Sequence, residues 1–182
     1  MDPLLQAALL TELNGQCNNF RLALELMRQS QTAAADPGAA SEALRRFWFY
    51  VQGMLAAVAN ISKILYPFRS TCAARGNHLR GLLGAAATAP FDPNSRNMRN
   101  NYEHLDERID VNWWNSPNRG SKRADYNFHP LGNLEAQFGA VNCFRNYDTQ
   151  TETLTFMGQH FPIRAIENDV LALQQQISPH LT

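Results

Sequence analysis

Apolar residues recur every three or four positions through the N-terminal part of the chain. The first such stripe contains Leu9, Leu13, Cys17, Phe20, Leu24 and Met27. This spacing is typical of a helix with one buried side. We expect a helix that begins after Asp2, a residue suited to the N-cap, and ends near Gln31.

A second stripe with the same period follows the turn-forming residues Asp36, Pro37 and Gly38. Its members are Leu44, Phe47, Trp48, Val51, Leu55, Val58, Ile61 and Leu65. They predict a helix that opens at Ser41 and stops at Pro67. Two long helices joined by a short loop are expected to pack as an antiparallel pair.

Two further helices are expected over residues 70–86 and 93–111, the second with Asp92 as its N-cap and Pro93 in its first turn. With the first pair they would complete an up-and-down four-helix bundle over residues 1–111. The predicted fold class is therefore mainly α. A long loop is expected over 112–138, and the pattern of residue types changes after it.

The last part of the chain, residues 139–182, predicts a β-hairpin and a terminal helix. Residues 141–147 and 153–157 are rich in β-branched and aromatic side chains, and a polar turn separates them. Phe161, Pro162 and Ile163 read as a short extension, and the final helix covers 164–177 with an apolar face of Ile166, Val170, Leu173 and Ile177. We expect the bundle, the loop and this part to form a single domain over 1–182.

Composition narrows the range of partners and compartments. The 182 residues include 16 basic and 16 acidic ones, so no overall charge attracts nucleic acid and any RNA contact needs a local patch. The three cysteines, Cys17, Cys72 and Cys143, are odd in number and not in C-x-x-C spacing, which argues against a disulfide framework and a zinc site. Without a leader-like start or a long apolar run, we expect a cytoplasmic protein with no membrane association.

The most informative motif lies on the helix expected over 93–111. It reads Arg99-Asn100-Asn101-Tyr102-Glu103-His104. Asn100 and His104 are one helical turn apart on one face, and Arg99 flanks them. The imidazole can transfer a proton near neutral pH, and the guanidinium can hold phosphate oxygens with two hydrogen bonds.

The motif and the expected bundle resemble the HEPN superfamily (higher eukaryotes and prokaryotes nucleotide-binding domain). The resemblance covers roughly residues 1–111, and its specific part is the six-residue motif. It implies a metal-independent endoribonuclease, often a toxin or a phage-defence component, that dimerises so that two motif helices face each other. By this resemblance Arg99, Asn100 and His104 are the catalytic residues, no cofactor is needed, and a cognate antitoxin protein is a further partner.

The chemistry agrees with that expectation. RNA supplies its own nucleophile, the 2′-hydroxyl, so cleavage needs a base, an acid and positive charge near the phosphate. One His104 fills one proton-transfer role at a time, and a homodimer would supply two. The acidic residues Asp106, Glu107 and Asp110 are expected to form a solvated face and not a metal site.

Several other residues are candidates for substrate binding. Trp114, next to Trp113, precedes the basic cluster Arg119, Lys122 and Arg123, and together they could stack on bases and hold phosphates of single-stranded RNA. The alternative is that a tryptophan caps the core and the basic cluster is only solvated. Tyr102 could stack on a base or pack between protomers, and His78 and Arg80 could add charge to the cleft.

Three functions remain open at this point. The first is the endoribonuclease, which the complete motif favours. The second is a non-catalytic HEPN-like module that binds a nucleotide or a protein, which the zero net charge favours. The third is an unrelated helical scaffold in which Arg99 and Glu103 form an ordinary i, i+4 ion pair.

Overall fold

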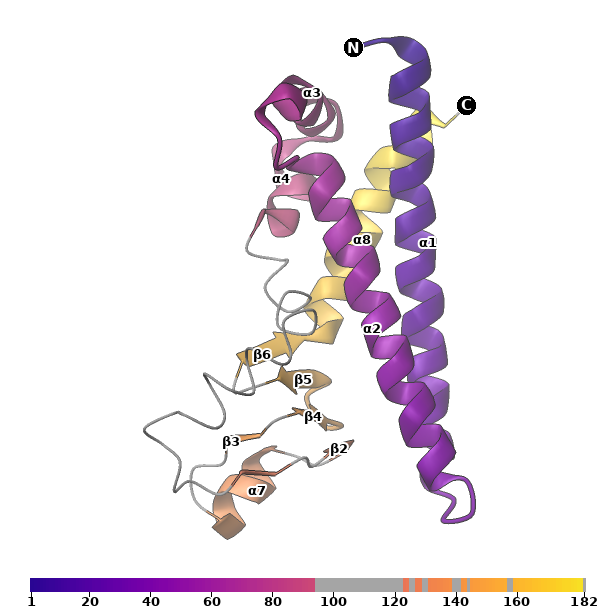
Figure 1. Cartoon of the computed structure of the whole chain (residues 1–182), viewed down its shortest axis with the longest axis vertical. Coiled ribbons are helices and arrows are strands. Elements are labelled where there is room, and N and C mark those ends of the chain that lie inside the picture. Colours follow the sequence, from indigo (N-terminus) through magenta and orange to yellow (C-terminus); the bar gives the residue numbers. More distant parts are fainter. Residues whose placement is uncertain are drawn as a thin grey trace. The chain divides into compact units, whose positions relative to one another are not determined.

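The protein is described by a computed structural model over residues 1–93, 123–124, 127–128, 131–138, 142–143, 145–156 and 159–181. The chain is mainly helical there, with a small sheet towards its C-terminal end and a terminal helix (Figure 1). It divides into two compact units, one of Met1–Arg99 with Glu167–Thr182 and one of Asn100–Ile166. Within the described ranges, no helix combines the length and the apolar character needed to cross a membrane.

The first unit contains the two long helices expected from the sequence, α1 (Pro3–Ala33) and α2 (Ala40–Leu65), which lie side by side (Figure 1). Asp2 caps α1 as predicted, because its Oδ1 accepts a hydrogen bond of 3.0 Å from the backbone N–H of Leu5. The predicted stripes are the buried faces of these helices. The exceptions are Leu9 and Leu44, which are half-buried, and Leu10 takes an inner position instead of Leu9.

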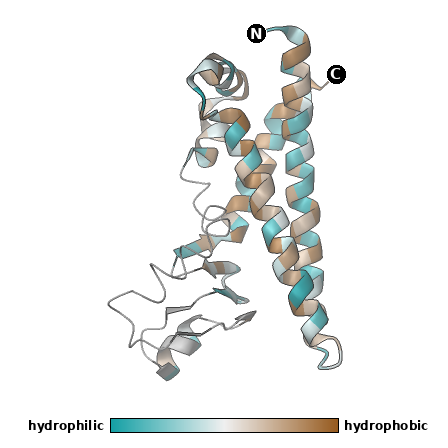
Figure 2. Cartoon of the chain, in the orientation of Figure 1, coloured by the Kyte–Doolittle hydropathy of each residue, from teal (hydrophilic) through white to brown (hydrophobic). Residues whose placement is uncertain are grey.

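Figure 2 shows hydrophobic and hydrophilic residues on each of the long helices, as expected for helices with one buried and one exposed side. Phe20 and Phe47 are fully buried, on α1 and α2 respectively. Burial of such rings stabilises the pair by roughly 1.5–3 kcal/mol for each side chain. The apolar seam between α1 and α2 therefore contributes substantially to the stability of this unit.

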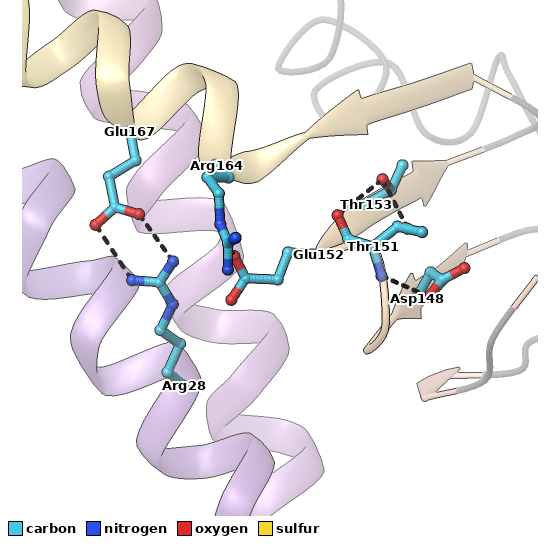
Figure 3. Close-up of polar contacts among 7 residues, drawn as sticks. All are labelled: Arg28, Asp148, Thr151, Glu152, Thr153, Arg164 and Glu167. Atoms are coloured by element: carbon cyan, nitrogen blue, oxygen red, sulfur yellow. Dashed lines mark hydrogen bonds and ion pairs between the residues drawn. The ribbon is translucent and has the colours of Figure 1, made fainter.

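The terminal helix, α8 (Ile163–Ile177), contributes its residues from Glu167 onward to the first unit. Arg28 on α1 donates two hydrogen bonds to the Glu167 carboxylate, at 3.2 and 2.8 Å (Figure 3). Gln174 donates to Asn14 and Asn18 on α1, at 3.0 and 2.8 Å. The predicted apolar face is buried at Val170, Leu173 and Ile177, while Ile166 is half-buried. Because a part-exposed ion pair is worth about 1 kcal/mol or less, this apolar face contributes more than the Arg28–Glu167 contact.

The helix predicted over 70–86 is not continuous. The structure has a 3₁₀ turn η1 (Ser70–Cys72), the helix α3 (Ala73–Leu83), the short helix α4 (Ala85–Thr88) and a second 3₁₀ turn η2 (Ala89–Phe91). Gly84 separates α3 from α4 with φ of 85°, a backbone geometry that other residues rarely adopt. This glycine ends α3 and changes the direction of the chain.

The second unit contains the predicted β-hairpin, formed by β4 (Arg145–Asp148) and β5 (Thr153–Phe156) in antiparallel register. Its turn is held by Asp148, whose Oδ1 accepts hydrogen bonds from the N–H groups of Gln150 and Thr151 at 2.9 and 3.0 Å. The expected extension is a strand, β6 (Gln159–Pro162), which pairs with β5. The hairpin prediction is therefore confirmed.

The sheet contains one strand that the sequence did not predict. Its order is β2-β4-β5-β6, where β2 (Asn127–Phe128) runs parallel to β4. The range 112–138, expected to be a long loop, also contains β1 (Arg123–Ala124) and the helix α7 (Leu131–Phe138). The strand β1 pairs with β3 (Asn142–Cys143).

The first turn of α8 belongs to the second unit and joins its hairpin. Arg164 donates through Nε to Glu152 Oε2 at 3.1 Å (Figure 3). The backbone N–H of Ile163 donates to the Glu152 carbonyl at 2.9 Å. Glu152 itself has φ of 50°, in the left-handed region that ends the hairpin turn. Glu152 thus connects the hairpin turn to the beginning of α8.

The buried Cys17 is expected to be chemically inert in the folded protein. Burial raises the pKa of its thiol from 9.0 to about 12, and the side chain is 0% exposed. In a Cys143→Ser variant at pH 8, iodoacetamide should therefore label the half-buried Cys72 and leave Cys17 unmodified. Mass spectrometry identifies the labelled cysteines. In denaturant, both Cys17 and Cys72 should be labelled. Equal labelling of the two thiols in the folded protein would contradict the described packing of α1.

Candidate functional site

The motif and most of the other candidate residues lie outside the described ranges. These are Arg99, Asn100, Tyr102, His104, Trp114, Arg119 and Lys122. Arg123 belongs to β1, where its Cα is paired with that of Asn142, and the placement of its side chain is not described. The structure describes the segment that precedes the motif, residues 88–92.

The segment that leads into the motif, residues 88–92, is attached to the C-terminal half of α2. The Tyr66 hydroxyl donates a hydrogen bond of 3.2 Å to the Thr88 carbonyl, and the Ser62 hydroxyl donates one of 3.3 Å to the Asp92 carbonyl. Phe91 between them is 1% exposed. Two hydrogen bonds and one buried ring therefore hold residues 88–92 against the end of α2.

The residue at the end of this segment has the backbone geometry expected of an N-cap. Asp92 adopts φ of −56° and ψ of 170°, an extended conformation. The helix for which the sequence predicts Asp92 as N-cap falls almost entirely outside the described ranges and stays a prediction.

Beside this attachment, Arg80 of α3 closes the C-terminal end of α2. Its Nη1 donates to the Leu65 carbonyl, its Nη2 donates to Asn77 Oδ1, and its Cζ lies 4.4 Å from the centroid of the Tyr66 ring. The last carbonyls of a helix have no partner within the helix and carry partial negative charge, so a cation is favourable here. The structure shows Arg80 as a cap of α2, while its predicted contribution of charge to the motif's cleft stays a prediction.

The close approach of α3 to the end of α2 depends on Gly76. A Cβ placed on this residue would lie 2.5 Å from Pro67 Cδ and 2.7 Å from the Leu65 carbonyl oxygen. These distances are shorter than normal van der Waals contact, so a side chain has no room. A glycine at this position lets Arg80 reach both Leu65 and Tyr66.

An open pocket of about 330 Å³ lies at this junction, all of it in the first unit. It is lined by Tyr66, Pro67, Phe68, Ala73, Asn77, Arg80 and Pro93, and we call it the Phe68 pocket. The Phe68 ring is 96% exposed, more than any other large apolar side chain in the described ranges. Sequence reasoning overlooked Tyr66 and Phe68, although the order Tyr-Pro-Phe after a long helix was a usable sign of aromatic side chains at a helix end.

Another candidate, His78, lies away from this pocket. Its Nε2 is 2.8 Å from Gln6 Oε1 at the beginning of α1.

A larger groove of about 540 Å³ follows α1, and its lining includes Arg21, Arg28 and Glu167. Because the charge of Arg28 is balanced by Glu167 at 2.8 Å, that groove is less suited to an anionic ligand than its two arginines suggest.

Some residues in the described ranges have a pKa that is shifted from its ordinary value, and these residues do not line the Phe68 pocket. A hydrogen bond from Arg46 and the charge of Arg45 lower the pKa of Glu42, and partial burial raises the pKa of Asp169. Within the described part of the chain, no three His, Cys, Asp or Glu side chains gather in a way that could hold a metal ion. What the Phe68 pocket offers a ligand is an exposed aromatic ring, a guanidinium and an amide.

Comparison with other proteins adds no relative to this picture: the chain matches no protein-family model, no curated protein and no solved structure.

Proposed function

We propose that this protein is a metal-independent endoribonuclease whose active site is composed of residues from two copies of the chain. The observation that carries the proposal is the complete motif Arg99-Asn100-x-x-x-His104, in a chain that is mainly helical. The four-helix HEPN-like bundle expected over 1–111 belongs to the same proposal. The described pair of α1 and α2 supports it as the first half of such a bundle.

The proposed reaction uses the 2′-hydroxyl of the RNA as nucleophile. One His104 removes the hydroxyl proton, the 2′-oxygen attacks the neighbouring phosphorus, and the bond from phosphorus to the 5′-oxygen breaks. The His104 of the second copy gives a proton to the departing 5′-oxygen. The products are a 2′,3′-cyclic phosphate and a 5′-hydroxyl, and no metal ion enters the reaction.

The remaining motif residues hold the phosphate and the imidazole. Arg99 stabilises the negative charge that develops on the phosphate oxygens, a role that suits a planar guanidinium with paired donors. Asn100, one helical turn from His104, orients the imidazole or the phosphate. Tyr102, Trp114, Arg119, Lys122 and Arg123 are the proposed contacts for the rest of the RNA strand.

The biological setting proposed with this activity is that of a toxin or a phage-defence component in the cytoplasm. A free ribonuclease would damage its own cell, so a cognate antitoxin protein is the expected partner besides the second copy. The equal numbers of acidic and basic residues support one alternative, a non-catalytic module that binds a nucleotide or a protein.

We expect the purified protein to cleave total RNA in the presence of EDTA. The fragments should carry 5′-hydroxyl ends, which polynucleotide kinase labels without prior phosphatase treatment. A matched RNA with 2′-O-methyl groups should remain intact, because it lacks the nucleophile. Cleavage that needs added Mg²⁺, or that also cuts the methylated RNA, would contradict the proposal. A stable dimer that cleaves neither RNA would favour the binding module.

A further inference from the structure

The Phe68 pocket combines an exposed aromatic ring, a fixed cation and an amide at one end of α2. We propose that it binds an unpaired nucleobase of single-stranded RNA, next to the segment that leads into the motif. The inference rests on the proposed function, because it identifies a part of the substrate that the same protein would recognise. All residues that line the pocket belong to the first unit.

Phe68 supplies the exposed aromatic ring of the pocket. Its ring is 96% exposed and lies just after the end of α2, whereas Phe91 in the same region is 1% exposed. The ring therefore contributes little to the core. Every nucleobase has a π face, so a solvent-exposed ring on the wall of a pocket is a suitable platform for stacking with an unpaired base.

The polar groups of the pocket belong to Arg80 and Asn77. Arg80 has five N–H donors, and the described contacts to Leu65 and Asn77 use two of them. Asn77 accepts from Arg80 through Oδ1, which sets the orientation of its amide and leaves the NH₂ group available as a donor. These N–H groups are able to hydrogen-bond the acceptor atoms on the edge of a stacked base.

The pocket is small, and its lining reaches Pro93, a few residues before the motif. A volume of about 330 Å³ is at the lower end of the range for small-molecule sites, which suits one base and not a duplex. Pro93 lines the pocket and precedes Arg99 by six residues, a chain length that spans at most about 20 Å even when fully extended. A base held here belongs to a strand that passes near the beginning of the motif.

The test measures RNA affinity in a His104→Ala background, in which cleavage does not consume the probe. A short fluorescein-labelled oligoadenylate is titrated alone and as a duplex with its complement, and fluorescence anisotropy is recorded. We expect single-stranded RNA to bind more tightly than the duplex. Replacing Phe68 by alanine should weaken single-strand binding by about five-fold or more, while Phe68→Tyr should retain it.

The matched control is Phe49→Ala. Phe49 is 69% exposed on α2 and stands 17 positions before Tyr66, which corresponds to about 25 Å along a helix. The Phe49→Ala substitution should leave the affinity for single-stranded RNA unchanged. Thermal unfolding and gel filtration of each variant show whether folding and oligomeric state are preserved. A Phe68→Ala protein that changes its oligomeric state and not its RNA affinity would overturn the inference, because the ring would then contact a second copy.

Failure of this inference is distinguishable from failure of the proposed function. If Phe68→Ala binds single-stranded RNA as well as the parent protein does, the pocket is not a base site, even where the wild-type protein cleaves RNA in EDTA. If RNA binding depends on Phe68 and the wild-type protein cleaves no RNA, the pocket is supported as a base site and the nuclease proposal fails. Absence of any RNA binding by the parent protein overturns the inference as well.

Discussion

In EDTA, replacing His104 by alanine is expected to lower the rate of RNA cleavage by about 10²–10⁴-fold, the usual contribution of general acid–base catalysis. In a composite site the substitution removes both proton-transfer groups at once, so the upper part of that range is expected. Arg99→Ala should cost about 10²–10³-fold, because it removes charge stabilisation and leaves proton transfer in place. Initial rates with a short fluorogenic RNA measure both effects.

The matched controls replace the same residue types outside the motif. His160 is exposed on β6, where its Nδ1 is 3.0 Å from the Thr155 hydroxyl, and Arg45 is an exposed residue of α2 paired with Glu42. His160→Ala and Arg45→Ala should cleave RNA at the wild-type rate. If His104→Ala retains full activity, or if all four variants lose activity equally, the cleavage does not come from the motif.

A composite site also predicts how mixed dimers behave. When wild-type and His104→Ala chains are refolded together in equal amounts, about a quarter of the dimers contain two wild-type chains. Activity should then fall to about a quarter of that of the same number of wild-type dimers. Independent sites in each chain would retain about half. The ratio therefore distinguishes a shared site from two separate ones without any structural measurement of the interface.

The part of the fold that the sequence predicts best is the part in which local periodicity and burial agree. In α1, α2 and α8 one face carries most of the large apolar residues, so the period alone places the helices to within one or two residues. The hairpin of β4 and β5 is equally local, because the turn that begins with Asp148 connects adjacent strands. Contacts of this kind join residues that are near one another in the sequence.

The features that sequence reasoning overlooked depend on contacts between distant segments. The strand β2 has two residues and is defined by pairing with residues of β4 that lie nineteen positions later in the chain. Gly84 follows two other glycines of the same region, and nothing local indicates that it alone has positive φ. The predicted helix over 70–86 therefore extended through the point at which the chain turns.

The candidate site likewise has one part that the sequence predicts and one part that it does not. The motif can be recognised in the sequence because its residues are spaced by one helical turn. The Phe68 pocket cannot, because it arises where α3 crosses the end of α2, and its Arg80 contacts Tyr66 and Leu65 from about fifteen positions away. Arg80 can be listed as a cation from sequence, but its role as a cap of α2 and as a wall of the pocket follows from the packing.

That packing leads to the second large effect, at Gly76. Replacing Gly76 by alanine is expected to destabilise the protein by about 1–3 kcal/mol, the typical cost of forcing extra volume into a closely packed place. The new methyl group would lie 2.5 Å from Pro67 Cδ and 2.7 Å from the Leu65 carbonyl oxygen, and one of these atoms belongs to the backbone. Relief requires α3 to move away from α2.

Gly81 on the same helix is the matched control, with the opposite expected sign. A Cβ on Gly81 meets nothing within 4 Å, and the residue is exposed in α3. Alanine should therefore stabilise the protein by up to about 1 kcal/mol through its higher helix propensity. In thermal unfolding, the Tm should fall for Gly76→Ala and rise for Gly81→Ala, by roughly 2–4 °C per kcal/mol.

The two alanine variants also test whether the stability of this junction and the geometry of the Phe68 pocket have one cause. If α3 moves away from α2 in Gly76→Ala, Arg80 loses its contacts with Leu65 and Tyr66, and the RNA affinity that depends on Phe68 should fall in the folded protein as well. Gly81→Ala should keep that affinity, because its methyl group points into open space. Equal unfolding temperatures for the two variants would mean that α3 does not approach the end of α2 as closely as these contacts require.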